Sequence, residues 1–177
     1  AAYRVHGDAC AVGGILDGKA RLQMQRYMQA KWHGTLPSTV SLNLAYTGAA
    51  FDLNGVNQTI GSLAGLAGTE VQLNGAYLTV GRNNATTTFG GIFKNGTVSG
   101  GGVVKVGSGQ LTLGGTGPSA FTGLTVISQG NVALSKVAGL AAIGGDVAMI
   151  NTLSPNLWAT ADNQFGPNSV LSFNSEV

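Results

Sequence analysis

The sequence predicts an all-β protein in which short strands are joined by tight turns. Apolar residues recur at every second position in short bursts, and Gly or Gly-Pro interrupts these bursts at close intervals. The 177 residues include 29 glycines against 4 prolines, and glycine adopts a positive φ at a turn without steric cost. Such short strands cannot bury a sheet face alone. They have to stack on similar neighbours, as in a β-solenoid or in some β-sandwiches.

The alternation also selects the residues expected to fill the interior. We expect strands at 50–53, 58–63, 69–73, 76–80, 86–93, 97–98, 103–106, 110–113, 120–127 and 131–134. Inward positions within the last four of these ranges give a core set of Val104, Val106, Leu111, Leu113, Val126 and Leu134. If the strands form a solenoid, the body holds about six to seven turns of roughly 20 residues or somewhat more.

Four phrases follow one another in this region: FDLNGVNQTIGSL at 51–63, VKVGSGQLTLGG at 104–115, AFTGLTV at 120–126 and GNVAL at 130–134. In this succession they resemble the autotransporter-associated β-strand repeat, which occurs in the passenger domains of bacterial surface proteins. The resemblance covers residues 40–134 well and 145–175 more loosely, and it does not reach residues 1–33. It implies a right-handed parallel β-helix, a β-solenoid, that is extracellular or lies at the bacterial cell surface. It implies no particular activity.

Composition narrows the classes of partner. A net charge of +2 is too small to indicate nucleic-acid binding. No run of apolar residues approaches the eighteen or so that a membrane-spanning helix needs. The charges are unevenly distributed, since five of the nine Lys and Arg residues lie in the first 31 positions: Arg4, Lys19, Arg21, Arg26 and Lys31.

Residues 1–33 differ from the body, 34–177, and we expect them to form an N-terminal cap or assembly segment. The stretch 19–32 (KARLQMQRYMQAKW) lacks Gly and Pro and places Ala20, Met24, Tyr27 and Met28 on one stripe, which predicts an amphipathic helix. Its apolar stripe is expected to cover the end or side of the β-body, and a membrane-surface helix is the alternative. Cys10, the only cysteine, is either a small buried hydrophobe or half of an intermolecular disulfide.

One phrase recurs near the two ends of the body. Pro, two small polar residues, Val and an alternating strand ending in Asn occur at 37–43 and again at 167–174. The recurrence is either an accident of common strand-turn chemistry or a sign that one copy's C-terminal end is continued by another copy's beginning. The second interpretation predicts head-to-tail self-association through Pro37, Val40, Leu42, Pro167, Val170 and Phe173.

Catalytic and metal-binding patterns are weak. His6, His33, Asp8, Cys10 and Asp17 are the ingredients of a nucleophilic or metal site, but they have no motif spacing. Asp52 and Glu70, about one turn apart, are the single carboxylate pair that could serve glycoside hydrolysis. We therefore expect no enzyme activity, no cofactor and no metal.

These observations favour a structural role. The expected function is that of an extracellular β-solenoid, like a passenger domain, that stacks head-to-tail into a fibre or surface layer, with itself as partner. The alternatives are an adhesin fragment that binds host or matrix glycans and, third, a polysaccharide-degrading β-helix.

Overall fold

The computed structural model describes residues 9–11 and 35–174, and within these ranges all regular structure is β-strand. The helix expected at 19–32 lies outside the described residues. The strands are β1 (Ala9–Ala11), β2 (Ser41–Leu44), β3 (Ala50–Asp52), β4 (Gln58–Ile60), β5 (Ser62–Gly65), β6 (Glu70–Gln72), β7 (Tyr77–Val80), β8 (Thr87–Phe89), β9 (Ile92–Lys94), β10 (Gly102–Lys105), β11 (Gln110–Gly115), β12 (Thr125–Lys136), β13 (Val147–Ala159) and β14 (Leu171–Asn174).

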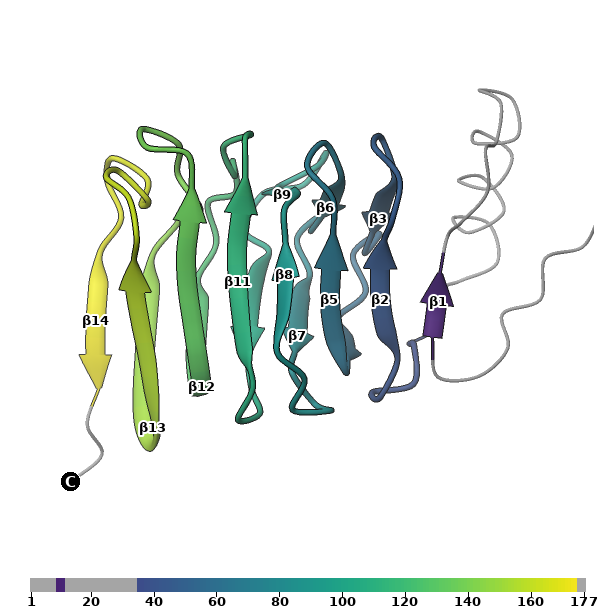
Figure 1. The fold of residues 1–177 in the computed structure, drawn as a ribbon, viewed down its shortest axis with the longest axis horizontal. Coiled ribbons are helices and arrows are strands. Elements are labelled where there is room, and N and C mark those ends of the chain that lie inside the picture. Colours follow the sequence, from purple (N-terminus) through teal and green to yellow (C-terminus); the bar gives the residue numbers. More distant parts are fainter. Residues whose placement is uncertain (1–8, 12–34, 175–177) are drawn as a thin grey trace, which may run out of the picture.

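Every strand pairing in the described part of the chain is parallel, so the fold is a parallel β-helix, or β-solenoid. The all-β solenoid prediction is confirmed, and the sandwich alternative is wrong. The turns are stacked in a row from β1 at one end to β14 at the other (Figure 1). Part of the segment 1–33 takes part in this stack, because β1 pairs with β2.

Each turn contributes strands to up to three lines that run along the stack. Line A contains β1, β2, β5, β8, β11 and the C-terminal parts of β12 and β13. Line B contains β4, β7, β10, the N-terminal parts of β12 and β13, and β14. Line C contains β3, β6 and β9, and single bridges at Lys94–Ala120 and Ile143–Phe165 extend it. β12 and β13 bend from line B into line A without ending.

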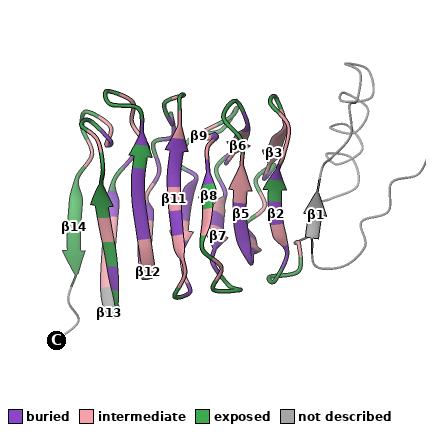
Figure 2. Cartoon of the chain, viewed as in Figure 1, coloured by how far each residue is buried: buried purple, intermediate pink, exposed green. Residues whose placement is uncertain are grey.

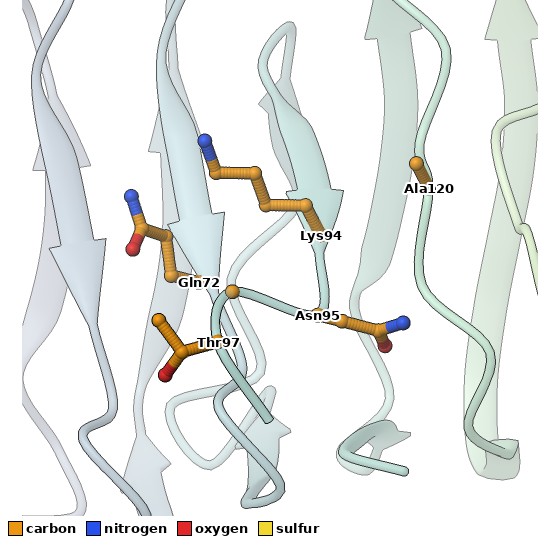
Figure 3. Close-up of a pocket in the computed structure, with 6 residues that line it drawn as sticks. Gln72, Lys94, Asn95, Thr97 and Ala120 are labelled. Carbon is orange, nitrogen blue, oxygen red and sulfur yellow. The ribbon is translucent and has the colours of Figure 1, made fainter. Parts of the chain in front are cut away.

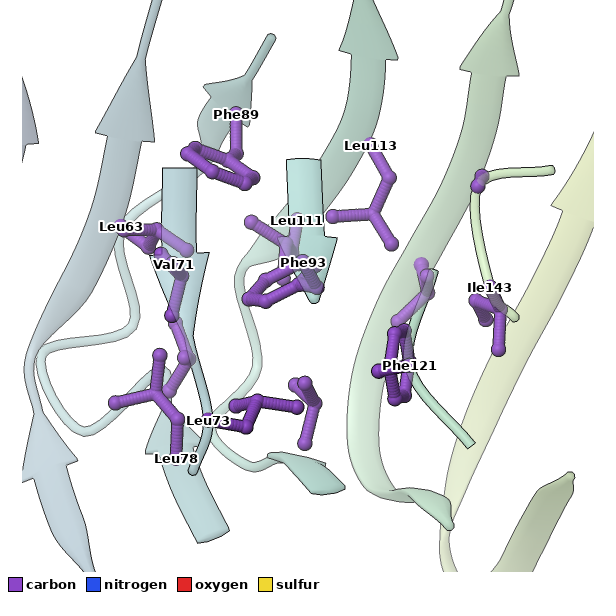
Figure 4. Close-up of a cluster of buried hydrophobic side chains, with 14 of the residues drawn as sticks. Leu63, Val71, Leu73, Leu78, Phe89, Phe93, Leu111, Leu113, Phe121 and Ile143 are labelled. Atoms are coloured by element: carbon purple, nitrogen blue, oxygen red, sulfur yellow. The ribbon is translucent and has the colours of Figure 1, made fainter. Parts of the chain in front are cut away.

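The core fills the space between the lines with aliphatic and aromatic side chains (Figure 4). Leu111 is in register with Val132 and Leu113 with Leu134, and all four are buried, as the alternation predicts. Three phenylalanines pack against one another: the ring centroids are 5.0 Å apart for Phe89 and Phe93, within one turn, and 5.9 Å apart for Phe93 and Phe121, in neighbouring turns. Each turn therefore buries the apolar face of its neighbour, which a single turn cannot do alone.

Three of the six residues expected in the core do not point into it. Val104, Val106 and Val126 are only partly buried, whereas Lys105 and Ile127 are fully buried. Because β10 and β12 are in register from Val103–Thr125 to Lys105–Ile127, the same shift of one residue affects both strands. Strand positions were otherwise largely correct, except that residues 97–98 form a turn and that the long strand β13 was not expected.

Two lysines point into the solenoid: Lys105 because of this shift, and Lys136 because it continues the inward alternation of Val132 and Leu134. Lys105 and Lys136 are each 2% exposed. The ammonium group of Lys105 donates to the carbonyl oxygens of Val106 and Gly107, both at 2.7 Å, and to that of Gln129 at 3.2 Å. Lys136 donates to the carbonyls of Gly91 and Gly114, at 2.9 and 2.8 Å. Each lysine thus joins backbone groups of neighbouring turns, which supplies the hydrogen bonds that a buried ammonium needs.

These two lysines make the stability pH-dependent. Burial lowers the pKa of each from 10.5 to about 8. Between these values the folded chain has released protons that the unfolded chain still binds, so the free energy of unfolding rises as the pH increases from about 8 to about 10.5. We expect a rise on the order of 3 kcal/mol per lysine, measured by urea unfolding across this range. The variant Lys105→Met/Lys136→Met should lose most of that rise, and an unchanged pH slope in the variant would contradict the assignment.

No helix that is long and apolar enough to cross a bilayer occurs in the described residues.

Candidate functional site

Among the strands that the structure describes, β14 is the last in the stack, and we call its outer edge the open end. It pairs through one edge with β13, from Val147–Leu171 to Ile150–Asn174. Within the described residues no strand pairs with its other edge. All four residues of β14 are exposed, and Figure 2 shows the strand entirely in the colour of exposed residues. A free parallel edge with accessible N–H and C=O groups is a template for a further strand.

The side chains at this end continue the core. Leu171 stands beside Val147, which is 1% exposed, and Phe173 stands beside Met149, which packs against the core cluster. They therefore occupy positions that face inward in the preceding turn, yet Leu171 is 40% and Phe173 70% exposed. Side chains at core positions are therefore left uncovered at this end. We call Val170, Leu171 and Phe173 the C-terminal apolar surface.

Exposed apolar side chains are concentrated in this region. Of the eight large hydrophobic residues that are exposed in the described part of the chain, three form the C-terminal apolar surface and two, Leu153 and Trp158, lie on the adjacent β13. The other three, Leu66, Val98 and Val137, lie singly in turns along the body. Single exposed hydrophobic residues are ordinary on a soluble protein, but a contiguous group marks an interaction surface.

The turn before β14 is held in place by hydrogen bonds to the preceding turn. The N–H of Val170 donates to Asp146 Oδ1 at 2.9 Å, and Ser169 Oγ donates to the carbonyl of Gly145 at 2.7 Å. The N–H of Ser169 also closes a turn with the carbonyl of Gly166 at 3.1 Å. The open edge is thus positioned before any partner arrives, which lowers the entropy cost of adding a strand.

The structure separates the six residues that the sequence singled out for self-association. Pro167, Val170 and Phe173 lie together at the C-terminal end and are exposed. Pro37 is exposed at the opposite end, but Val40 and Leu42 are 5% and 3% exposed and belong to the core of the first turn. β2 already has β1 and β5 as neighbours, so its edges are occupied.

The recurrent phrase does not mark equivalent positions. Its first copy forms β2 in line A, and its second copy forms β14 in line B. Both copies begin with a turn, closed by a hydrogen bond from Val40 N–H to the Pro37 carbonyl at 3.0 Å in the first and from Ser169 to Gly166 in the second. The recurrence therefore reflects common turn-strand chemistry. The open edge of β14, and the roles of Leu171 and Asp146, have no signal in the sequence because they depend on which strand is last in its line.

A second feature is an open hollow of about 480 Å³ on the side of the solenoid, at line C. It is lined by Gln72, Lys94, Asn95, Gly96, Thr97 and Ala120 (Figure 3). The polar groups around it bind one another. Lys94 forms an ion pair of 2.5 Å with Glu70, Gln72 donates to Glu70 at 3.3 Å, and Asn95 exchanges hydrogen bonds with Thr122. A ligand would have to displace these contacts, so the hollow is a weaker candidate than the open end.

Asp52 and Glu70, the two carboxylates considered for glycoside hydrolysis, form hydrogen bonds or ion pairs with neighbouring residues of the chain. Asp52 and Glu70 lie on adjacent strands of line C, β3 and β6. Asp52 Oδ1 accepts hydrogen bonds from the backbone N–H of Asn54 at 2.8 Å and from Asn74 Nδ2 at 2.5 Å, while Glu70 pairs with Lys94. These contacts hold both carboxylates in place on the side of the solenoid.

No group of three or more His, Cys, Asp and Glu side chains that could hold a metal ion occurs in the described part of the chain. His6, Asp8, Asp17 and His33 lie outside that part. Cys10 lies on β1, of which only the backbone is described.

No protein-family model, no curated protein and no solved structure matches this chain.

Proposed function

We propose that the chain is a structural β-solenoid of an extracellular or cell-surface protein, and that copies add end to end to build a fibre or surface layer. The observation that carries this proposal is the open end, where a strand edge with no partner among residues 9–11 and 35–174 coincides with the C-terminal apolar surface. A further turn placed on this end would pair the edge of β14 and cover Leu171 and Phe173 at the same time.

Covering the apolar side chains at this end would offset part of the free-energy cost of association. Burying a large aliphatic or aromatic side chain that was exposed contributes about 1.5–3 kcal/mol. Two such side chains and a few strand hydrogen bonds offset part of the roughly 4–15 kcal/mol that association costs in lost freedom. Electrostatic repulsion between two copies is weak, because only 9% of the residues of the chain are charged.

The extracellular part of the proposal is supported by the ordered phrases between residues 51 and 134. They resemble the repeat of autotransporter passenger domains, and the parallel stacking of β4 to β12 is the architecture that this resemblance implies.

The double substitution Val170→Lys/Phe173→Lys tests the proposal. Two cations placed on the C-terminal apolar surface should lower the association constant by at least about tenfold, because burying each would require its desolvation. Sedimentation velocity over a range of concentrations measures this, and circular dichroism should keep its strand signature.

The matched control is Leu66→Lys/Val137→Lys. These residues are each 54% exposed, but they lie in turns on the side of the solenoid. The control should associate like the wild type. Equal sedimentation of all three proteins would contradict an end-on contact. A wild-type chain that stays monomeric at every concentration would contradict the assembly function and favour a binding module.

A further inference from the structure

The sequence contains three Asn-Gly steps, and each lies at a corner where the chain leaves line C for line B. They are Asn54–Gly55, Asn74–Gly75 and Asn95–Gly96. In the first, the N–H of Val56 donates to the Leu53 carbonyl at 2.9 Å, and in the second the N–H of Ala76 donates to the Leu73 carbonyl, also at 2.9 Å. The two central residues have φ values of 48° and 75° in the first turn and 46° and 78° in the second. Backbone conformation therefore does not distinguish the first two asparagines.

The side chain of Asn74 is held by both neighbouring turns, and the residue is 9% exposed. Its Oδ1 accepts hydrogen bonds from the backbone N–H of Thr97 at 2.6 Å and of Val98 at 3.3 Å, and from Thr97 Oγ1 at 3.0 Å. Its Nδ2 donates to Asp52 Oδ1 at 2.5 Å. This amide group cannot rotate without breaking four hydrogen bonds.

The side chain of Asn95 is held by the following turn. Its Oδ1 accepts a hydrogen bond from the backbone N–H of Thr122 at 3.1 Å, and its Nδ2 donates to Thr122 Oγ1 at 3.3 Å. Rotation of this amide group therefore breaks two hydrogen bonds.

The side chain of Asn54 lacks such contacts. It is exposed, and its amide group has no hydrogen-bond partner among the described residues. At this corner the next turn of the solenoid has a tight two-residue turn, whereas the longer loop 95–101 supplies the donors that Asn74 binds. A Cβ added to Gly55 would meet only the carbonyl oxygen of Asn74, at 3.8 Å, so the corner also has free space.

We propose that Asn54 is a site of spontaneous deamidation, and that their hydrogen bonds protect Asn74 and Asn95 from the same reaction. The backbone nitrogen of Gly55, after losing its proton to a base in solution, attacks Cγ of Asn54. The new C–N bond closes a five-membered imide ring, the Cγ–Nδ2 bond breaks, and the side-chain nitrogen leaves as ammonia. Water then opens the imide at either carbonyl, which yields aspartate or isoaspartate. The net reaction consumes one water, releases one ammonia and adds one negative charge to the chain.

The three sites should differ in rate because ring closure requires the side-chain amide to turn toward the next backbone nitrogen. An exposed corner with few contacts opens locally at a low free-energy cost. At Asn74 and Asn95 the same movement must also break side-chain hydrogen bonds, so we expect Asn54 to react at least about tenfold faster in the folded protein. In the urea-unfolded chain the three sites should react at similar rates, because each asparagine precedes a glycine.

Mass spectrometry of proteolytic peptides tests the proposal on the wild-type protein, incubated both folded and in urea at a mildly alkaline pH. Deamidation raises the mass of a peptide by the difference between an OH and an NH₂ group, and fragment spectra assign it to one residue. The control Asn54→Gln should abolish the signal at position 54, because a six-membered ring closes more slowly, and circular dichroism should keep its strand signature. The variant Asp52→Ala removes the acceptor of Asn74 Nδ2 and should raise the rate at Asn74 severalfold, with no change at Asn95.

The proposal is overturned if Asn54 in the folded protein reacts no faster than Asn74 and Asn95. It is also overturned if folded Asn54 stays unmodified under conditions in which the urea-unfolded chain reacts at all three sites. If Asp52→Ala leaves the rate at Asn74 unchanged, the hydrogen bond to Asp52 does not protect Asn74.

Discussion

Replacing Phe93 by alanine is expected to lower the free energy of unfolding by about 3–5 kcal/mol. Phe93 is 1% exposed, and its ring packs between that of Phe89, in the same turn, and that of Phe121, in the next turn. Its removal leaves a cavity that the neighbouring turns cannot close without shifting their backbone hydrogen bonds. Urea unfolding followed by circular dichroism measures the loss.

Phe173→Ala is the matched control, since it removes the same side chain at a position that is 70% exposed. In the monomer its effect on stability should stay within about 0.5 kcal/mol. If the two substitutions cost the same, the ring of Phe93 does not hold successive turns together.

Replacing Gly115 by alanine is expected to destabilise the fold by more than about 4 kcal/mol. Gly115 ends β11 with a φ of 93°, and a Cβ at this position would overlap the carbonyl oxygen of Gly90 in the preceding turn. Backbone atoms cannot move aside as a side chain can. The substitution therefore forces two turns apart, and thermal unfolding monitored by circular dichroism should show the loss.

Gly100→Ala separates this clash from backbone strain. Gly100 has a φ of 90°, but no heavy atom lies within 4 Å of the position that its Cβ would occupy. It should cost only the roughly 1–2 kcal/mol of placing an L-residue in the left-handed region. Equal losses for Gly115→Ala and Gly100→Ala would show that close stacking of the turns is not what requires glycine at 115.

The fold could be predicted from local patterns because short alternating bursts and glycine turns leave few ways to bury apolar surface. The register could not be predicted everywhere. At Leu111 and Leu113 the outward neighbours are polar, so alternation identifies the inward face. At 103–106 valines occupy both faces. The expectation that the charged Lys105 points outward then selects Val104 and Val106 as the inward pair. The opposite register is stable because the buried ammonium group of Lys105 donates to the carbonyl oxygens of Val106, Gly107 and Gln129. These three groups come together only in the folded stack, so the sequence does not reveal them.

The candidate site was predicted in part. The sequence singled out Val170 and Phe173, which the structure places at the open end. Val40 and Leu42, in a nearly identical phrase, are core residues, and Leu42 has paired strands on both sides. Local sequence specifies a turn followed by a strand. Whether that strand is covered depends on its place in the stack, which a single phrase does not encode.

Electron cryomicroscopy of the wild-type protein at a concentration where it associates tests the central claim most directly. The account predicts particles that lengthen along the solenoid axis, with a strand spacing of about 4.8 Å that continues across each junction between copies. Copies joined through their sides, or junctions at which the strand stacking breaks, would contradict it.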